Sequence, residues 1–556
     1  MASDAEIARS ADLRPIEQVA ARLSLGPEDL VPCGRHIAKL PLALLARPRR
    51  RERAARLVLV SALTPTPAGE GKTTTSIGLA DALSRLGESA CLALRQPSLG
   101  PAFGRKGGAT GGGRSQLAPA DRINLHFTGD FHAIASAHNF LAAALDNHLH
   151  HGNELGIDPR RVLWRRVLDV NDRALRRVVT GLGGPAGGVP RETGFDITAA
   201  SEVMAILCLA EGLDDLRARL ERILVAFTRA GQPVRAGELR VTGALLALLR
   251  DALEPNLVQT LEGTPALVHG GPFANIAHGC SSVLATRMAL ERADWAITEA
   301  GFGFDLGAEK FFDIKCASAG LDTAAVVLVA TARALKMHGG AGPDAAARPD
   351  PAAVERGLPN LEKHVENIRA FGEVPVVALN RFAADSEAEI EVVRRRCAAL
   401  GAPFAVSDHH ARGGTGALPL ARAVVSHAEK ASRSFRPLYA PGDPVAEKIQ
   451  TVARTMYGAR DVRFSAAARR DLAEIERLGC AGLPVCIAKI PGSLSDDPGL
   501  RGRPRDFELR VRGLEIAAGA GFLVVLTGDV LRMPGLPPRP RAEDIDVVEG
   551  RIVGLA

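Results

Sequence analysis

One stretch of the sequence has residue types that could hold the phosphates of a nucleotide. It reads TPTPAGEGKTTT over residues 64–75, follows an apolar run and opens a helical pattern. In such a loop, backbone amides and the helix N-terminus face the anion, while a lysine adds positive charge. We therefore predict that the loop binds ATP, with Lys72 on the phosphates and Thr73 as a Mg²⁺ ligand. The predicted ATP-binding residues are Thr64, Pro65, Thr66, Pro67, Ala68, Gly69, Glu70, Gly71, Lys72, Thr73 and Thr74.

The loop departs from the general phosphate-loop pattern at one residue, because that pattern asks for glycine where Thr66 stands. An ordinary turn between a strand and a helix is the alternative interpretation. Phosphate binding is favoured because Gly69, Gly71, Lys72 and Thr73 all fit the pattern.

A second candidate site follows the next predicted strand. Arg95 stands at the end of that strand, where it could clamp a phosphoryl group, and Gly104–Gly113 carries six glycines beside Arg105 and Lys106. Glycines let the backbone approach an anionic ligand closely. A flexible surface loop is the alternative for this stretch.

Three further residues could take part in chemistry. Asp130 could accept a hydrogen bond from a substrate, His132 could act as a base, and Glu299 could associate with magnesium at the end of its strand. Each residue alone is more often a helix cap or a satisfied core group.

The elements that must position these residues form a strand, turn and helix order. Short apolar runs end abruptly in polar residues or glycine and alternate with helical patterns such as Thr73–Leu86. This alternation favours a parallel, doubly wound α/β core. In such a core, ligands bind at the carboxyl ends of the strands. The predicted strands are Leu57–Leu63, Ala90–Leu94, Trp295–Thr298, Ala324–Ala330, Val374–Leu379, Pro484–Ala488 and Phe522–Leu526.

Two changes in pattern predict the domain organisation. Residues from about 150 to 260 are rich in Arg and Leu and indicate a helical or α+β insertion. A loop rich in small residues and proline at 339–351 precedes a second boundary. We expect a nucleotide-binding core over 1–365, including the insertion, and a smaller C-terminal α/β domain over 366–556.

Composition argues against several classes of protein. No apolar run approaches the length that spans a bilayer, and the first residues lack a signal-peptide pattern, so we expect a cytoplasmic protein without a membrane partner. The net charge is +6, but arginines alternate with acids, which argues against nucleic-acid binding. Eight scattered cysteines indicate no structural metal site.

Lysine is scarce in this chain. Only ten of the 69 basic residues are lysine, and five of the ten lie in glycine-rich stretches, which suggests functional roles for those five.

Taken together, these stretches resemble the formate–tetrahydrofolate ligase family. The resemblance is carried by FTGDFHAI at 127–134, GPFANIAHGC at 271–280 and ARALKMHGG at 332–340, and matching stretches sample the whole chain. The family's own phosphate loop reads TPTPAGEGKT, which accounts for the threonine at position 66.

The resemblance implies a two-step reaction. Formate would attack the γ-phosphate of MgATP to give formyl phosphate, and N10 of tetrahydrofolate would then take the formyl group. Lys72, Arg95 and Gln96 would lie at the chemical centre, with Arg95 holding formyl phosphate. Asp130 and Phe382 would contact the folate. The resemblance further implies a homotetramer and activation by a monovalent cation.

The chain departs from the family mainly on the folate side. Gln96 replaces a usual glutamate and cannot take a proton. His410 replaces a usual tryptophan opposite Phe382, and the loss of stacking would be about 1 kcal/mol. Three interpretations therefore stand: a ligase, a divergent paralogue with a weakened or altered folate step, or a non-catalytic folate- or nucleotide-binding protein.

Overall fold

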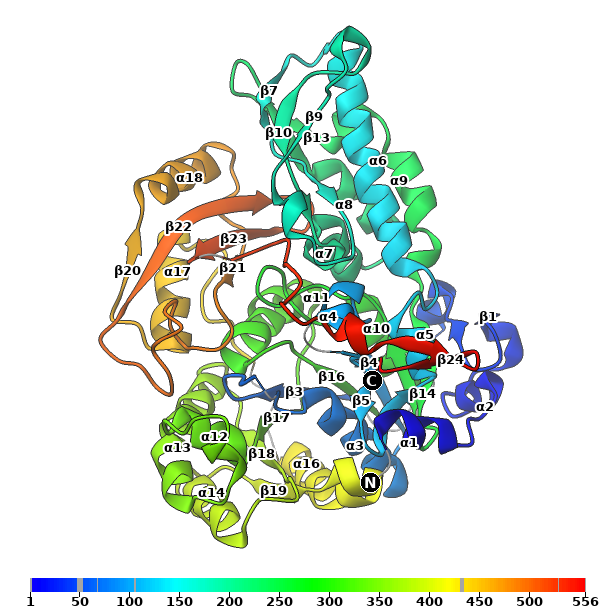
Figure 1. Ribbon diagram of the computed structural model, residues 1–556, viewed down its shortest axis with the longest axis vertical. Helices are drawn as coiled ribbons and strands as arrows, with labels where there is room; N and C mark the ends of the chain where they lie inside the picture. The colour runs from blue at the N-terminus through cyan, green and yellow to red at the C-terminus, as the bar shows by residue number, and fades with distance from the viewer. Residues whose placement is uncertain are drawn as a thin grey trace.

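A large, mostly parallel β-sheet forms the centre of the protein (Figure 1). The computed structural model describes residues 3–47, 54–67, 69–104, 107–430, 435–528 and 530–555. Every neighbouring pair from β15 to β19 is parallel, in the order β15-β4-β16-β3-β17-β18-β19. Their bounds are β15 (Pro265–Val268), β4 (Ala90–Leu94), β16 (Trp295–Glu299), β3 (Arg56–Ala62), β17 (Ala325–Ala330), β18 (Pro375–Asn380) and β19 (Phe404–Ser407).

Antiparallel strands extend the sheet beyond β15. The mixed α/β class predicted from the apolar runs is confirmed. Five of the seven runs lie in β3, β4, β16, β17 and β18, whose residues are largely buried because helices cover both faces of the sheet. The added strands are β14 (Asn256–Thr260), β2 (Ala38–Lys39), β1 (Val31–Pro32), β6 (Ser115–Ala118) and β5 (Gly111–Gly112).

Helices connect the strands of the sheet. α3 (Lys72–Arg85) follows β3 directly, and its residues 75–83 are all buried. Within the described residues, no helix is long and apolar enough to cross a membrane. The other helices of this part are α1 (Asp4–Ser10), α2 (Ile16–Ala21), α4 (Leu99–Phe103), α5 (Ala120–Asn124), α10 (Val283–Arg292), α11 (Ala317–Ala319), α12 (Ala332–His338), α13 (Pro351–Ala370), α14 (Glu387–Ala399), α15 (His409–Gly416) and α16 (Leu418–Lys430).

The segment predicted as an insertion forms small sheets and helices at the top of Figure 1. It follows α6 (Asp130–His150), which ends at the predicted limit of about 150. The remaining elements are β7 (Ile157–Val162), β8 (Arg166–Val167), β9 (Val178–Thr180), β10 (Arg191–Thr193), β11 (Phe195–Asp196), β12 (Leu224–Thr228), β13 (Pro233–Arg235), α7 (Glu202–Leu209), α8 (Leu213–Arg222) and α9 (Thr242–Leu249).

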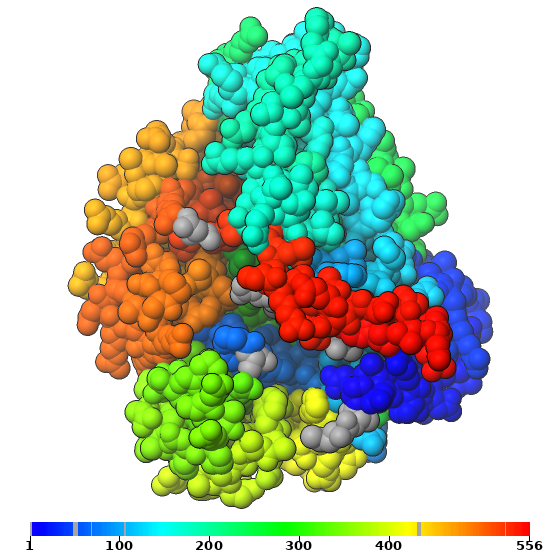
Figure 2. Space-filling view, in the orientation of Figure 1, coloured from blue at the N-terminus to red at the C-terminus, as the bar shows by residue number. Residues whose placement is uncertain are grey.

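The C-terminal part contains a smaller sheet in the order β20-β22-β23-β21, and its last segment crosses the front of the molecule in red (Figure 2). β18 and β19 also follow residue 365 but belong to the large sheet, so that sheet extends past the predicted boundary. The division into domains stays a prediction. The elements are α17 (Val445–Val452), β20 (Asp461–Phe464), α18 (Ala466–Arg477), β21 (Val485–Ala488), β22 (Glu508–Ala517), β23 (Phe522–Thr527), β24 (Asp546–Val548) and β25 (Arg551–Val553).

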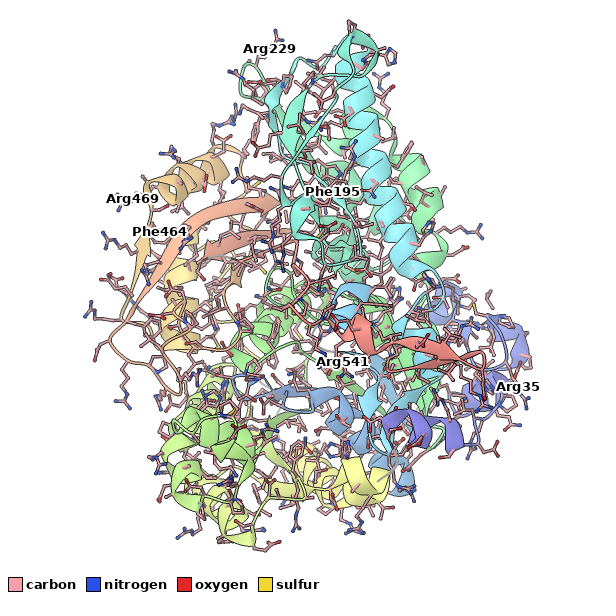
Figure 3. The ribbon with its side chains drawn as sticks, in the orientation of Figure 1. Arg35, Phe195, Arg229, Phe464, Arg469 and Arg541 are labelled. Atoms are coloured by element: carbon pink, nitrogen blue, oxygen red, sulfur yellow. The ribbon has the colours of Figure 1, made fainter. Side chains whose placement is uncertain are left out.

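Most of the scarce lysines have structural roles inside the protein. Lys310 donates to the Ala274 carbonyl at 2.6 Å, and Lys448 donates to three backbone carbonyls. A compact ammonium with three donors suits such converging carbonyls, whereas arginines such as Arg229 reach outward at the periphery (Figure 3). For these buried lysines, scarcity therefore reflects structural roles, and a chemical role for Lys72 stays a prediction. The buried lysines are 39, 310, 315, 336, 363, 448 and 489; Lys106 lies outside the described residues.

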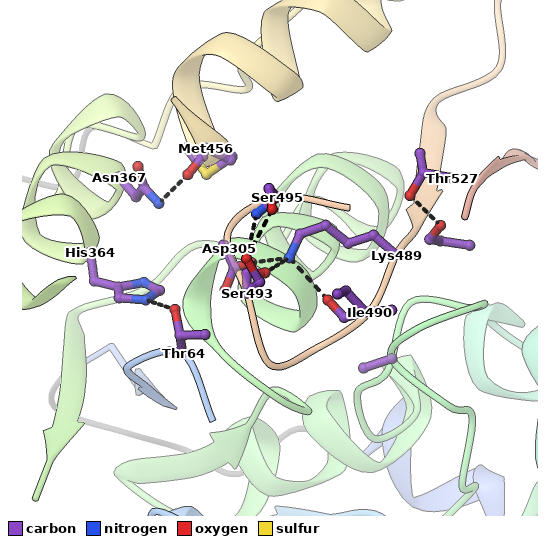
Figure 4. Close-up of polar contacts among 12 residues, drawn as sticks. Thr64, Asp305, His364, Asn367, Met456, Lys489, Ile490, Ser493, Ser495 and Thr527 are labelled. Carbon is purple, nitrogen blue, oxygen red and sulfur yellow. Dashed lines mark hydrogen bonds and ion pairs between the residues drawn. The ribbon is translucent and has the colours of Figure 1, made fainter. Parts of the chain in front are cut away.

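A buried ion pair joins the C-terminal part to the core. Lys489, which follows β21, contacts Asp305 at 2.8 Å, and both side chains have no exposed surface (Figure 4). Lys489 also donates to the carbonyls of Ile490 and Ser493. The pair thereby ties the loop after β21 to the core segment Phe304–Ala308.

Removing one partner of this pair should be costly. Lys489→Ala leaves the Asp305 carboxylate buried and uncompensated, so we expect the free energy of unfolding to fall by about 3–5 kcal/mol in urea denaturation. Lys430→Ala at an exposed helix end is the control and should stay within about 0.5 kcal/mol of the parent. Lys489→Met combined with Asp305→Asn should recover part of the loss. Equal effects of the two alanine variants would contradict this role.

Candidate functional site

The predicted site residues meet at one edge of the sheet. Because β4, β16, β3, β18 and β19 are parallel, their carboxyl ends lie together. Arg95 and Gln96 follow β4, Glu299 ends β16, and the 64–71 loop follows β3. Phe382 and His410 follow β18 and β19, and the N–H of Arg381, just after β18, donates to the carbonyl of Ser407, the last residue of β19.

The 64–71 loop turns sharply into α3. Gly69 and Gly71 have φ values of +75° and +76°, a left-handed conformation that glycine adopts without strain. A Cβ at Gly71 would lie 2.4 Å from Asn380 Nδ2, so this position also lacks room for a side chain. Thr66, Pro67 and Gly69 stay accessible, as do residues 71–74. Ala68 lies outside the described residues.

Glu70 points into the protein and holds the loop in shape. Its Oε1 accepts hydrogen bonds from the backbone N–H and hydroxyl of Thr66, at 2.8 and 2.9 Å, and its Oε2 accepts one from the Thr331 hydroxyl at 3.0 Å. Asn380 Nδ2 donates to the Glu70 carbonyl at 3.2 Å. These bonds hold the described part of the loop in shape.

Thr64 anchors the beginning of the loop to α12 and α13. Its hydroxyl is buried and contacts His364 Nε2 at 3.0 Å (Figure 4). The same hydroxyl accepts a hydrogen bond from Asn360 Nδ2 at 3.0 Å. Its carbonyl lies 2.8 Å from His338 Nε2. Sequence reasoning grouped Thr64 and Glu70 with the accessible loop residues, because nothing local distinguishes a side chain that turns inward.

The charged groups of the site lie around Glu299. Thr73 donates its hydroxyl hydrogen to Glu299 Oε2 at 2.8 Å, and Arg95 Nη2 lies 3.9 Å from Glu299 Oε1. Burial lowers the pKa of Lys72, while the nearby carboxylates of Glu299 and Glu70 oppose that change. The arrangement places a hydroxyl, a carboxylate and two cations together, as binding of a phosphate–magnesium group requires.

Arg95 is also held by residues that the sequence did not single out. Its Nη1 donates to the Pro272 carbonyl at 3.2 Å. A Cβ at Gly301 would come within 2.9 Å of the same nitrogen. Pro272 lies in the GPFANIAHGC stretch, so family resemblance was the available signal for it.

Gln96 and Asp130 are both buried. The backbone N–H of Gln96 donates to the Gly270 carbonyl, while its side-chain Oε1 has no hydrogen-bond partner within the described residues. Asp130 accepts hydrogen bonds from Lys39 at 2.8 Å and from Asn256 at 2.6 Å. Each carboxylate oxygen of Asp130 thus accepts from a protein donor, and the contact of Asp130 with folate stays a prediction.

Phe382 and His410 are the most accessible of the predicted folate residues. Phe382 is 44% exposed as a whole residue, and the side chain of His410 is 55% exposed. Rings this open can take a planar ligand without displacing core side chains. No group of three or more His, Cys, Asp or Glu residues in the described ranges could hold a metal ion by itself.

Comparisons with known proteins match the chain over nearly its whole length. The family described as formate–tetrahydrofolate ligase matches residues 2–556. Curated proteins named formate–tetrahydrofolate ligase are similar to the chain: one from Hyphomonas neptunium at 55% identity over all of both chains, and one from Granulibacter bethesdensis at 54% identity over all of this chain and 97% of its own. A third, from Methylobacterium sp. strain 4-46, is 55% identical over all of both chains.

The two loop glycines offer a matched test of the predicted ATP site. Gly71→Ala must displace Asn380 from the Glu70 carbonyl, whereas Gly69→Ala has the same positive φ but nothing within 4 Å of its Cβ. Backbone strain should cost about 1 kcal/mol in each variant. We expect Gly71→Ala to weaken ATP binding, measured by titration calorimetry, about ten-fold more than Gly69→Ala. Equal losses would show that the contact with Asn380 does not shape the loop.

Proposed function

The chain belongs to the formate–tetrahydrofolate ligase family, and on that premise we propose that it joins formate to tetrahydrofolate at the expense of ATP. The products are 10-formyltetrahydrofolate, ADP and phosphate. One observation carries the proposal: Lys72, Thr73 and Arg95 converge with Glu299 at a single sheet edge in a chain that matches the family from residue 2 to residue 556.

In the first step, the loop orients the triphosphate of ATP. Backbone N–H groups at the start of α3, which begins at Lys72, face the phosphates, and Lys72 neutralises their charge. The Thr73 hydroxyl and the Glu299 carboxylate are oxygen ligands that suit Mg²⁺, and the ion would supply further neutralisation of the phosphates. A formate oxygen attacks the γ-phosphorus, the bond to ADP breaks, and formyl phosphate results.

In the second step, Arg95 holds formyl phosphate through its fixed guanidinium. Tetrahydrofolate binds between Phe382 and His410, which brings N10 to the formyl carbon. The nitrogen attacks that carbon, the carbon–oxygen bond breaks, and phosphate leaves with the proton from N10. Positioning and charge neutralisation account for both steps, since the reaction needs no covalent bond to the protein.

The finer predictions from the resemblance belong to the same proposal. We take the core to be a phosphate-loop, doubly wound sheet with a separate C-terminal domain completing the folate cleft. The enzyme acts as a cytoplasmic homotetramer activated by a monovalent cation. Neither a paralogue with another acceptor nor a silent binding protein has an observation in its favour.

A product assay tests this function directly. Purified protein with MgATP and formate should form ADP and 10-formyltetrahydrofolate only when tetrahydrofolate is present, and Lys72→Ala should lower turnover by about 10²-fold or more. Lys430→Ala serves as the control and should match the parent. ADP release that ignores tetrahydrofolate would argue for a different acceptor, and no ADP at all would argue for a binding protein.

Restoring a carboxylate at position 96 tests the departure from the family. Gln96→Glu supplies a group that can accept the N10 proton, so we expect tetrahydrofolate-dependent kcat to rise by roughly ten-fold while KM for ATP stays unchanged. Steady-state kinetics with each substrate varied separately measures both. A fall in turnover would mean instead that the surrounding site has adapted to glutamine.

A further inference from the structure

The glycine-rich stretch near the site is held by segments from opposite ends of the chain. We call residues 3–10 and 541–555 the terminal segments. Gly113 N–H donates to Asp4 Oδ1 at 2.9 Å, Gly108 N–H donates to the Leu555 carbonyl at 2.8 Å, and the Gly104 carbonyl accepts from Arg541 N–H at 2.7 Å. The described part of this stretch is therefore ordered by protein contacts, and the flexible-loop alternative fails there.

The two terminal segments also contact each other. Arg9 Nη2 donates to the Ile552 carbonyl at 2.5 Å, and Figure 2 shows the C-terminal segment, in red, lying along the N-terminal segment, in dark blue. Ser3 and Glu6 form a capping box that fixes the first turn of α1, where Asp4 lies. Asp4 is thus presented from a fixed helix end.

Asp4 links the N-terminal segment to the glycine-rich stretch and lies next to His410. Besides binding Gly113, it accepts a hydrogen bond at its backbone carbonyl from Gln116 Nε2 at 2.9 Å, and its Oδ1 lies 3.9 Å from His410 Nε2. A carboxylate acceptor gives a shorter and stronger hydrogen bond to a backbone N–H than a neutral oxygen does. Glycine-rich backbone needs such contacts because it loses the most conformational entropy when ordered.

The glycine-rich stretch in turn supports His410. Arg114 N–H donates to the His410 carbonyl at 2.8 Å, and a Cβ at Gly113 would lie 2.1 Å from that carbonyl oxygen. The backbones of residues 113–114 and 410 are therefore in direct contact, and a shift of Gly113 must move His410 or break this contact.

We propose that Asp4 is a positioning residue for tetrahydrofolate. Its carboxylate fixes Gly113 and, through the bond from Arg114, the backbone of His410 at the side of the folate slot. The proposal rests on the proposed function in one respect, namely that His410 borders the folate. Asp4 does not touch the reacting atoms and has no part in binding ATP.

The test compares Asp4→Ala with Asp12→Ala, an exposed aspartate just beyond α1. We expect Asp4→Ala to raise KM for tetrahydrofolate roughly five-fold while KM for ATP and Tm stay at parent values. Asp12→Ala should change none of these quantities. An unchanged KM for tetrahydrofolate, or equal rises for both substrates with a lowered Tm, would overturn the proposal.

Two further measurements separate this proposal from the function on which it rests. Hydrogen–deuterium exchange of a peptide covering 107–116 should speed up in Asp4→Ala and in a chain ending at Gly550, but not in Asp12→Ala, whatever the reaction catalysed. Phe382→Ala tests the folate slot without involving Asp4 and should raise KM for tetrahydrofolate. If Phe382→Ala has this effect and Asp4→Ala has none, the positioning role is wrong and the function stands.

Discussion

The parallel pairing of strands from β15 to β19 is the constraint on which the rest of the structure depends. Parallel strands end at a common edge, so the loops after β3 and β4 converge with those after β18 and β19, although hundreds of residues separate the two pairs in the chain. Glu299 occupies the end of the central strand β16, within hydrogen-bond distance of Thr73 and 3.9 Å from Arg95. A sheet with mixed directions would separate these groups.

Buried polar groups determine how the site is supported. Thr64 and Glu70 lie in the phosphate loop, yet their side chains turn inward and bind other parts of the core. Lys489 and Asp305 are paired without access to water, which links the C-terminal part to the core beside the loop. An unpartnered group at any of these positions would be costly, so each contact restricts where the neighbouring backbone can lie.

Much of the fold and part of the site could be predicted from local pattern. The apolar runs became strands, and Lys72, Thr73 and Arg95 lie where strand ends place them. The roles of most lysines could not be predicted, because burial depends on distant carbonyls and carboxylates rather than on glycine-rich neighbours. The strand β19 at Phe404–Ser407 was not among the predicted strands, although it belongs to the large sheet, since its short apolar pattern does not report strand pairing.

The sequence by itself determined the α/β class, the strand–loop–helix at residues 56–85 and the family, because these depend on residue types and spacings within short stretches. Tertiary structure alone decided that Glu70 faces inward, that Asp130 accepts hydrogen bonds from Lys39 and Asn256, and that Asp4 binds the backbone next to His410. Apart from the local bonds between Glu70 and Thr66, these contacts join residues 91 to 261 positions apart, whose side chains become neighbours only when the chain has folded.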